Sequence, residues 1–114
     1  MANTFRLVNN AVMSTSANTT EALYTAGSGK TAIVLGLTLA NIHTSQVTGT
    51  VTVTDSSNSN ETSHIVKDIP IPVGSSVEIM AGNKIVVEAT DVIKVSCSVA
   101  DKISATLSIM EIDV

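Results

Sequence analysis

Hydrophobic and polar residues alternate along most of the chain from residue 32 onward. Side chains of a β-strand point in turn to the two faces of its sheet, so this period of two predicts strands with one buried face. Short segments rich in Gly, Pro, Asn and Ser separate the alternating runs, which is typical of antiparallel proteins. The pattern predicts seven strands, at about residues 32–42, 47–54, 64–69, 75–80, 84–89, 91–100 and 103–112.

The phase of the alternation predicts which side chains face the core. In segment 47–54 the threonines occupy every second position and form a solvent-facing side opposite the valines. Pro70 and Pro72 cannot donate to a central ladder, so residues 69–76 are expected at a sheet edge or corner. Ala81–Lys84 (AGNK) predicts a tight hairpin turn, because Gly and Asn accept positive φ. The predicted core positions are Ile33, Leu35, Leu37, Leu39, Val47, Val51, Val53, Ile93, Val95, Cys97, Val99, Ile103, Ala105, Leu107 and Ile109.

Residues 1–31 lack this regularity and are rich in small polar side chains. They contain one short predicted strand around Phe5 and a small apolar stretch at residues 22–24. We therefore predict an N-terminal arm or loop region at residues 1–31 and a β-sandwich domain at residues 32–114. A chain without residues 1–30 is expected to fold but to lose its attachment to a partner.

Composition supports an all-β fold. The chain has 114 residues, 44% of them hydrophobic and only 2% aromatic, and it is rich in β-branched Val, Ile and Thr, which favour strands over helices. This length fits one domain. We predict a single antiparallel β-sandwich or jelly roll with an extended N-terminal arm. Cys97 is the only cysteine, which excludes an internal disulfide.

Candidate chemistry is sparse. The run GSGKT at residues 27–31 resembles the end of a phosphate-binding loop, but Tyr24 stands where that motif requires glycine, and a strand follows instead of a helix. His43 and His64 have no potential metal ligand at a suitable spacing. The sequence therefore predicts a protein that is not an enzyme, with no catalytic residue, no cofactor and no metal.

The acidic residues show no spacing that favours a catalytic pair of carboxylates. They occur singly, and their positions predict outward-facing side chains or turns, so a solubilising role accounts for them. The residues concerned are Glu78, Glu88, Asp91, Glu111 and Asp113.

Charge and hydropathy exclude two classes of partner. The net charge is −4 and the six basic residues are dispersed, which argues against nucleic acid because phosphate contacts supply most of that affinity. Apolar stretches are too short to span a bilayer, which requires about 20 residues. The first ten residues show no basic segment followed by an apolar run, so we expect assembly in a cytoplasm.

Three segments carry a resemblance to known proteins: TAIVLGLTLANI, HIVKDIPIPVGSSVEIMAGNKIVVEATDVIKV and the closing SIMEI. Over residues 31–112 the chain resembles small virion structural proteins of tailed bacteriophages, particularly marine and cyanobacterial phages. The resemblance implies a β-sandwich accessory component with a role in particle assembly or stability. It brings no catalytic or binding residues with it.

On this basis we expect a capsid decoration protein that binds the major capsid protein and stabilises the head shell of a virion assembled in the host cytoplasm. A homo-oligomer is expected, with a homotrimer favoured because trimers suit quasi-threefold sites. One alternative is a neck, tail or fibre component. Another, from a different class, is a carbohydrate-binding module.

Apolar residues at outward or arm positions are the candidate interface residues. They could form an exposed apolar patch, or they could belong to a second buried sheet face. The candidates are Phe5, Leu7, Tyr24, Met80, Val86, Val92, Met110 and Ile112.

Overall fold

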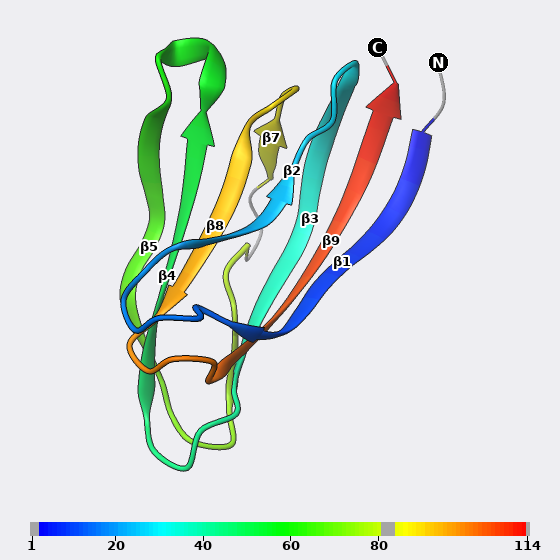
Figure 1. Ribbon diagram of the computed structural model, residues 1–114. Coiled ribbons are helices and arrows are strands. Elements are labelled where there is room, and N and C mark those ends of the chain that lie inside the picture. The colour runs from blue at the N-terminus through cyan, green and yellow to red at the C-terminus, as the bar shows by residue number, and fades with distance from the viewer. Residues whose placement is uncertain (1–2, 81–83, 114) are drawn as a thin grey trace.

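The protein forms two antiparallel β-sheets packed face to face, as seen in a computed structural model that describes residues 3–80 and 84–113 (Figure 1). The predicted all-β sandwich is confirmed. Its elements are β1 (Asn3–Met13), β2 (Glu21–Thr25), β3 (Lys30–Asn41), β4 (Val47–Asp55), the 3₁₀ turn η1 (Ser56–Asn58), β5 (Glu61–Ile71), β6 (Ser76–Glu78), β7 (Ile85–Val87), β8 (Val92–Cys97) and β9 (Ile103–Asp113).

One sheet has five strands in the order β1-β9-β3-β6, with β7 also paired to β3; the other has four, in the order β2-β8-β4-β5. Every pairing is antiparallel. The first and last strands, β1 and β9, are antiparallel neighbours in the five-stranded sheet, so Asn3 at the start of β1 lies opposite Ile112 near the end of β9 (Figure 1).

The expectation of a loosely packed arm over residues 1–31 is wrong for the part of that segment that the structure describes. β1 pairs with β9 from Asn3 to Met13, and β2 pairs with β8 from Glu21 to Thr25. An edge strand needs little apolar patterning because β9 supplies the hydrogen-bond partners for its backbone, and β1 buries few of its side chains. Removing residues 1–30 would therefore take a strand from each sheet.

The core lies between the two sheets. The predicted inward phase is confirmed along β9 for all four positions and along β8 for Ile93, Val95 and Cys97, whereas Val99 is only partly buried. The largest fully buried side chains are Met13, Leu37, Leu39, Ile71, Ile93, Ile103, Leu107, Ile109, Val34, Val47, Val51 and Val87.

The predicted phase is correct for only the second half of β3. Val34 pairs with Ile109 and Gly36 with Ser108, so Leu35 is an extra residue that forms a β-bulge. A bulge of one residue exchanges the faces of a strand. Leu37 and Leu39 consequently face the core as predicted, while Ile33 and Leu35 do not, and Val34 is buried in their place.

Strand β4 departs from the prediction at its end. Val47 and Val51 are buried, but Val53 is only partly buried and Thr52 is almost inaccessible. Thr52 occupies the middle of the four-stranded sheet, with His64 opposite it on β5 and Lys94 on β8. Neighbours on both sides shield a central threonine even on the outer face of a sheet, so polarity alone does not predict its exposure.

Residues 75–80 and 84–89 were predicted to pair as a hairpin, but the strands in these two segments, β6 and β7, do not pair with each other. β6 pairs with Thr38–Ala40 and β7 with Ala32–Val34, both antiparallel to β3, so the two short strands run in the same direction along one edge. The Glu78 carboxylate lies where β6 ends and accepts hydrogen bonds from the Leu37 and Met80 N–H groups at 2.8 and 3.1 Å. Residues 81–83 of the predicted turn lie outside the described residues.

Candidate functional site

A row of apolar side chains crosses the outer face of the five-stranded sheet. Phe5 on β1 is opposite Met110 on β9, Met110 is opposite Ile33 on β3, and Ile33 is opposite Val86 on β7. Directly opposed residues of an antiparallel sheet point to the same face with their Cβ atoms about 5 Å apart. These four residues, named the apolar row below, therefore form a continuous line over four strands.

The apolar row is accessible to solvent at both ends. Phe5 is 72% exposed and Val86 is 56% exposed, whereas Met110 and Ile33 between them are partly buried by their neighbours. Leu7, the next outward residue of β1, is 64% exposed. Large contiguous apolar patches are uncommon on monomeric proteins and mark interaction sites.

The surface around the row is uncharged along β1 and β9. Ile112 extends the patch beyond Met110, and besides Leu7 the remaining outward positions where Asn3–Asn10 pairs with β9 carry only serine, threonine and asparagine. No ionic group therefore has to be desolvated there when a partner covers this face.

The structure brings together five of the predicted interface residues and separates the other three. Val92 is partly buried on β8 of the other sheet. Tyr24 and Met80 belong to the buried core, so the buried alternative holds for these two residues and neither can form part of an exposed patch. Ile33 joins the row but was missed, because the bulge at Leu35 conceals its outward phase. The five residues that share the outer face are Phe5, Leu7, Val86, Met110 and Ile112.

A buried hydrogen-bond network explains why Tyr24 lies inside. Its hydroxyl donates to Glu111 Oε2 at 2.6 Å, and Arg6 Nη1 donates to the same oxygen at 2.9 Å. Tyr24 belongs to the four-stranded sheet, whereas Glu111 and Arg6 belong to the five-stranded sheet. The network therefore links the two sheets, and the prediction that Glu111 faces outward is wrong.

The network shifts the acidity of its members. Burial, followed by the hydrogen bond to Glu111 and its negative charge, raises the pKa of Tyr24 well above its ordinary value. The Tyr24 hydrogen bond, and then the Arg6 hydrogen bond and charge, outweigh burial and lower the pKa of Glu111. Tyr24 thus stays protonated and Glu111 ionised at neutral pH, as their hydrogen bond requires.

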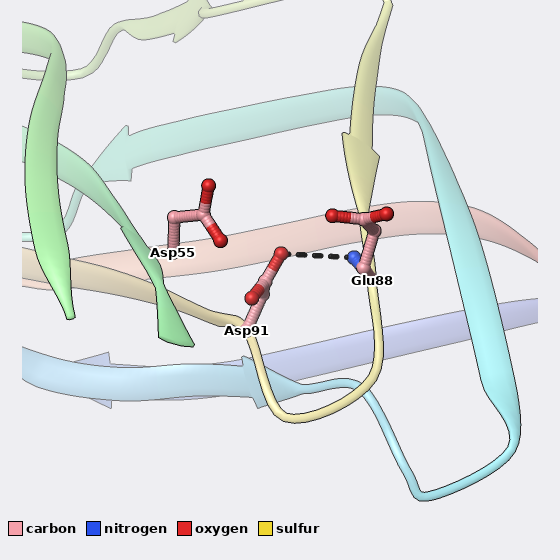
Figure 2. A group of neighbouring side chains, drawn as sticks. All are labelled: Asp55, Glu88 and Asp91. Atoms are coloured by element: carbon pink, nitrogen blue, oxygen red, sulfur yellow. Dashed lines mark hydrogen bonds between the residues drawn. The ribbon is translucent and has the colours of Figure 1, made fainter. Parts of the chain in front are cut away.

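A second polar cluster lies at the end of the sandwich where β4 and β7 end and β8 begins. Figure 2 shows the carboxylates of Asp55, Glu88 and Asp91, each of which offers an oxygen within 4.8 Å of the others. Carboxylate oxygens are the ligands preferred by Ca²⁺ and Mg²⁺, so the donor set suits a hard divalent cation. Sequence spacing did not predict this cluster because Asp55 is far from the other two in the chain.

Asp91 already has a structural role in this cluster. Its Oδ1 accepts hydrogen bonds from the Ser56 N–H at 2.9 Å and the Ser56 hydroxyl at 3.1 Å, and its Oδ2 accepts one from the Glu88 N–H at 3.0 Å (Figure 2). Its side chain is nearly inaccessible, contrary to the predicted outward position. Asp91 therefore fixes the η1 loop to the turn between β7 and β8.

Replacing Asp91 with alanine is expected to lower the free energy of unfolding by about 2 kcal/mol, because two backbone N–H groups lose their acceptor. Urea denaturation in the presence of a chelator measures this loss without any contribution from metal. Asp55→Ala is the matched control, since Asp55 bonds only within its own loop, to Ser57. An Asp91→Ala protein as stable as the control would contradict the structural role.

The GSGKT segment forms the turn between β2 and β3. Gly29 has a φ of 74°, and the Lys30 N–H donates to the Gly27 carbonyl at 3.2 Å. The half-exposed Lys30 ammonium pairs with the Asp113 carboxylate at the end of β9. No cavity able to enclose a ligand is present among residues 3–80 and 84–113. Within the same ranges, no helix is long and apolar enough to cross a membrane.

The fold defines a small antiparallel β-sandwich protein. No protein-family model matches the chain, and no curated protein does so either. Among solved structures, the chain is similar to a protein described under the words "Bacillus endospore appendages form a novel family of disulfide-linked pili", with 14% identity and a TM-score of 0.51. The similarity covers 99% of this chain and 88% of the other. At this identity the likeness establishes the fold alone.

Proposed function

We propose that the chain is a non-enzymatic structural subunit that attaches to a larger protein assembly through the apolar row. Within that class, the proposal is a capsid decoration protein that binds the major capsid protein of a tailed bacteriophage and stabilises its shell, located in the virion. The observation that carries the proposal is the in-register line of Phe5, Met110, Ile33 and Val86, which lies beside uncharged outward residues of β1 and β9.

The apolar row can supply a modest binding energy at each contact, and attachment becomes strong when the same contact is repeated over a symmetric shell. Fully burying a large apolar side chain is worth about 1.5 to 3 kcal/mol, and Phe5, Leu7 and Val86 are all more than half exposed. Association and side-chain ordering offset much of this gain, so one contact is modest. Many copies on a symmetric shell strengthen attachment through multivalency.

A second candidate is a fibre, neck or tail component, and the specific support is the fold shared with a pilus protein. That neighbour is described as disulfide-linked. Cys97 is the only cysteine here and its side chain is buried between the sheets, so a polymer of this chain would depend on noncovalent contacts. A carbohydrate-binding module has less support, because Tyr24 is buried and unavailable as a sugar platform.

The apolar row is tested by replacing Val86 with aspartate. We expect binding to particles that lack the chain to weaken by at least about tenfold, because a carboxylate must be desolvated at the contact, and tenfold corresponds to about 1.4 kcal/mol. Sedimentation with purified particles measures the binding. The copy number by mass spectrometry then separates shell decoration, with many copies, from a single ring in a neck or tail.

Val73→Asp is the matched control, because Val73 is also 56% exposed but lies in the turn after β5, away from the row. Both variants are expected to keep the native circular dichroism spectrum. Equal binding by the Val86 and Val73 variants would contradict attachment through the apolar row.

A further inference from the structure

Strand β1 forms one edge of the five-stranded sheet. It pairs with β9 on one side, and no other strand among the described residues pairs with its second side. Its pairing is regular from Asn3 to Asn10, and the register shifts only after that point. Along these eight residues every second one points its backbone N–H and C=O groups away from β9, where they are free to pair with another strand.

The other sheet edges are less suited to such pairing. β6 and β7 have three residues each, and β2 has five with a shift in its register. β5 is long but carries two bulges, the left-handed residue Asp68, and Pro70, which has no N–H to donate. Short strands, bulges and proline are the features by which natural proteins prevent edge-to-edge association.

The regular part of β1 has none of these protections. It contains no proline, glycine or lysine. Its one charged residue, Arg6, turns inward to bind Glu111, and its outward side chains include the exposed Phe5 and Leu7. An edge that is long, regular, apolar and uncharged on its outer side favours the addition of a strand.

We propose that β1 pairs antiparallel with β1 of a second copy of this chain, around a twofold axis perpendicular to the sheet. This deepens the proposed structural function by naming the partner at this edge. A twofold axis places outward residues opposite outward residues, so neither Arg6 nor any carboxylate enters the contact on the outer face. The five-stranded sheets of the two copies become one continuous sheet.

The pairing also joins the two apolar rows. Phe5 is the row's residue nearest this edge, and Leu7 follows it on the same face. With the axis at Leu7, Leu7 lies opposite Leu7 of the second copy and Phe5 lies diagonal to it, and apolar cross-strand pairs each contribute about 0.2 to 1 kcal/mol. The dimer therefore presents a wider apolar surface to a particle than one copy does.

Single cysteines on the full chain test the inference in a Cys97→Ala background. Opposed Cα atoms of an antiparallel pair are about 4.5 to 5.5 Å apart, within the range of a disulfide. With Leu7 opposite Leu7 of the second copy, we expect Leu7→Cys to form a covalent dimer at least about tenfold faster than Ser63→Cys, an exposed position on β5. Light scattering is expected to give the mass of two chains for the unmodified protein.

A monomeric or trimeric mass, or cross-linking on β1 no faster than at Ser63, would overturn the inference. A double variant, Leu7→Lys with Asn9→Lys, places like charges across the axis and is expected to give a folded monomer. The proposed function is tested separately by the Val86→Asp variant. It is contradicted if that variant binds particles as well as the Val73→Asp control does. If β1 fails to cross-link while Val86→Asp still releases the chain from particles, only the dimer is disproved.

Discussion

Replacing Gly49 with valine is expected to lower the free energy of unfolding by about 3 kcal/mol, the upper part of the usual range for overpacking a core. Gly49 lies on β4 and faces the opposite sheet. A Cβ atom there would meet Ile103 Cδ1 at 3.1 Å and Leu39 Cδ1 at 3.2 Å, closer than ordinary van der Waals contact. Both atoms belong to buried side chains of the five-stranded sheet, which have little room to move.

Comparing the valine variant with two others separates the cost of overpacking the core from the effect of replacing a glycine on the backbone. Gly49→Ala adds only the Cβ atom and is expected to cost less than Gly49→Val. Gly27→Val is the control, because the nearest atom to its Cβ would be Lys30 Cγ at 3.9 Å, an ordinary contact with a flexible side chain. Urea denaturation followed by circular dichroism measures all three. Equal stabilities for the Gly49 and Gly27 valine variants would show that the sheets do not approach closely at Gly49.

Replacing Glu111 with alanine is expected to cost about 2 to 3 kcal/mol. The substitution leaves the buried Tyr24 hydroxyl without an acceptor and Arg6 without its counterion. The cost is below that of breaking a fully buried ion pair, because the Arg6 side chain is about half exposed and can be hydrated by solvent. Tyr24→Phe removes only the hydroxyl and is expected to cost less.

Tyrosine absorbance provides an independent measurement, because Tyr24 is the only tyrosine and the chain has no tryptophan. In the native protein Tyr24 is expected to resist ionisation above pH 10, where free tyrosine titrates. Glu111→Ala removes the hydrogen bond and the charge that contribute to this shift, so the pKa of Tyr24 is expected to fall toward its ordinary value. An unchanged tyrosine titration in a folded Glu111→Ala protein would contradict the network.

The network also gives the stability a defined pH dependence. Because the folded pKa of Glu111 is lowered, its contribution is complete above the ordinary carboxyl value of about 4.3 and is lost as the pH falls through the folded value. The pKa of Tyr24 is raised, so its contribution is complete below about pH 10 and is lost at higher pH. Tyr24→Phe is expected to reduce the alkaline loss but to leave an acid-side loss.

The strands with uninterrupted alternation were predicted best. In β9 every second residue from Ile103 to Ile109 is buried, as the sequence indicates, because the strand is regular and lies between two neighbours. The prediction failed at Ile33 and Leu35 because one bulged residue reverses the phase, and no local pattern marks its position. It found only a short strand around Phe5 where β1 runs from Asn3 to Met13, because an edge strand can be held by backbone hydrogen bonds with little burial of its own side chains.

The candidate site was predicted in part. Outward phase identified Val86, Met110 and Ile112, but it also selected Met80, which the fold buries. Tyr24 was selected as part of an apolar stretch in the predicted arm, although its hydroxyl has a buried acceptor 87 residues later in the chain. The acidic cluster was missed because Asp55 meets Glu88 and Asp91 only when β4 and β8 pair.

The sequence by itself determined that this is an all-β protein with an aliphatic core, a buried Cys97 and no regular helical pattern, because side-chain alternation and β-branched composition are local properties. Only the tertiary structure decided which strands are neighbours, and thereby which apolar residues form one row and which edge remains unpaired. Strand order brings together residues that are distant in the chain. The backbone hydrogen bonds that pair strands involve the same N–H and C=O groups whatever the side chains, so no local sequence pattern shows which strands are neighbours.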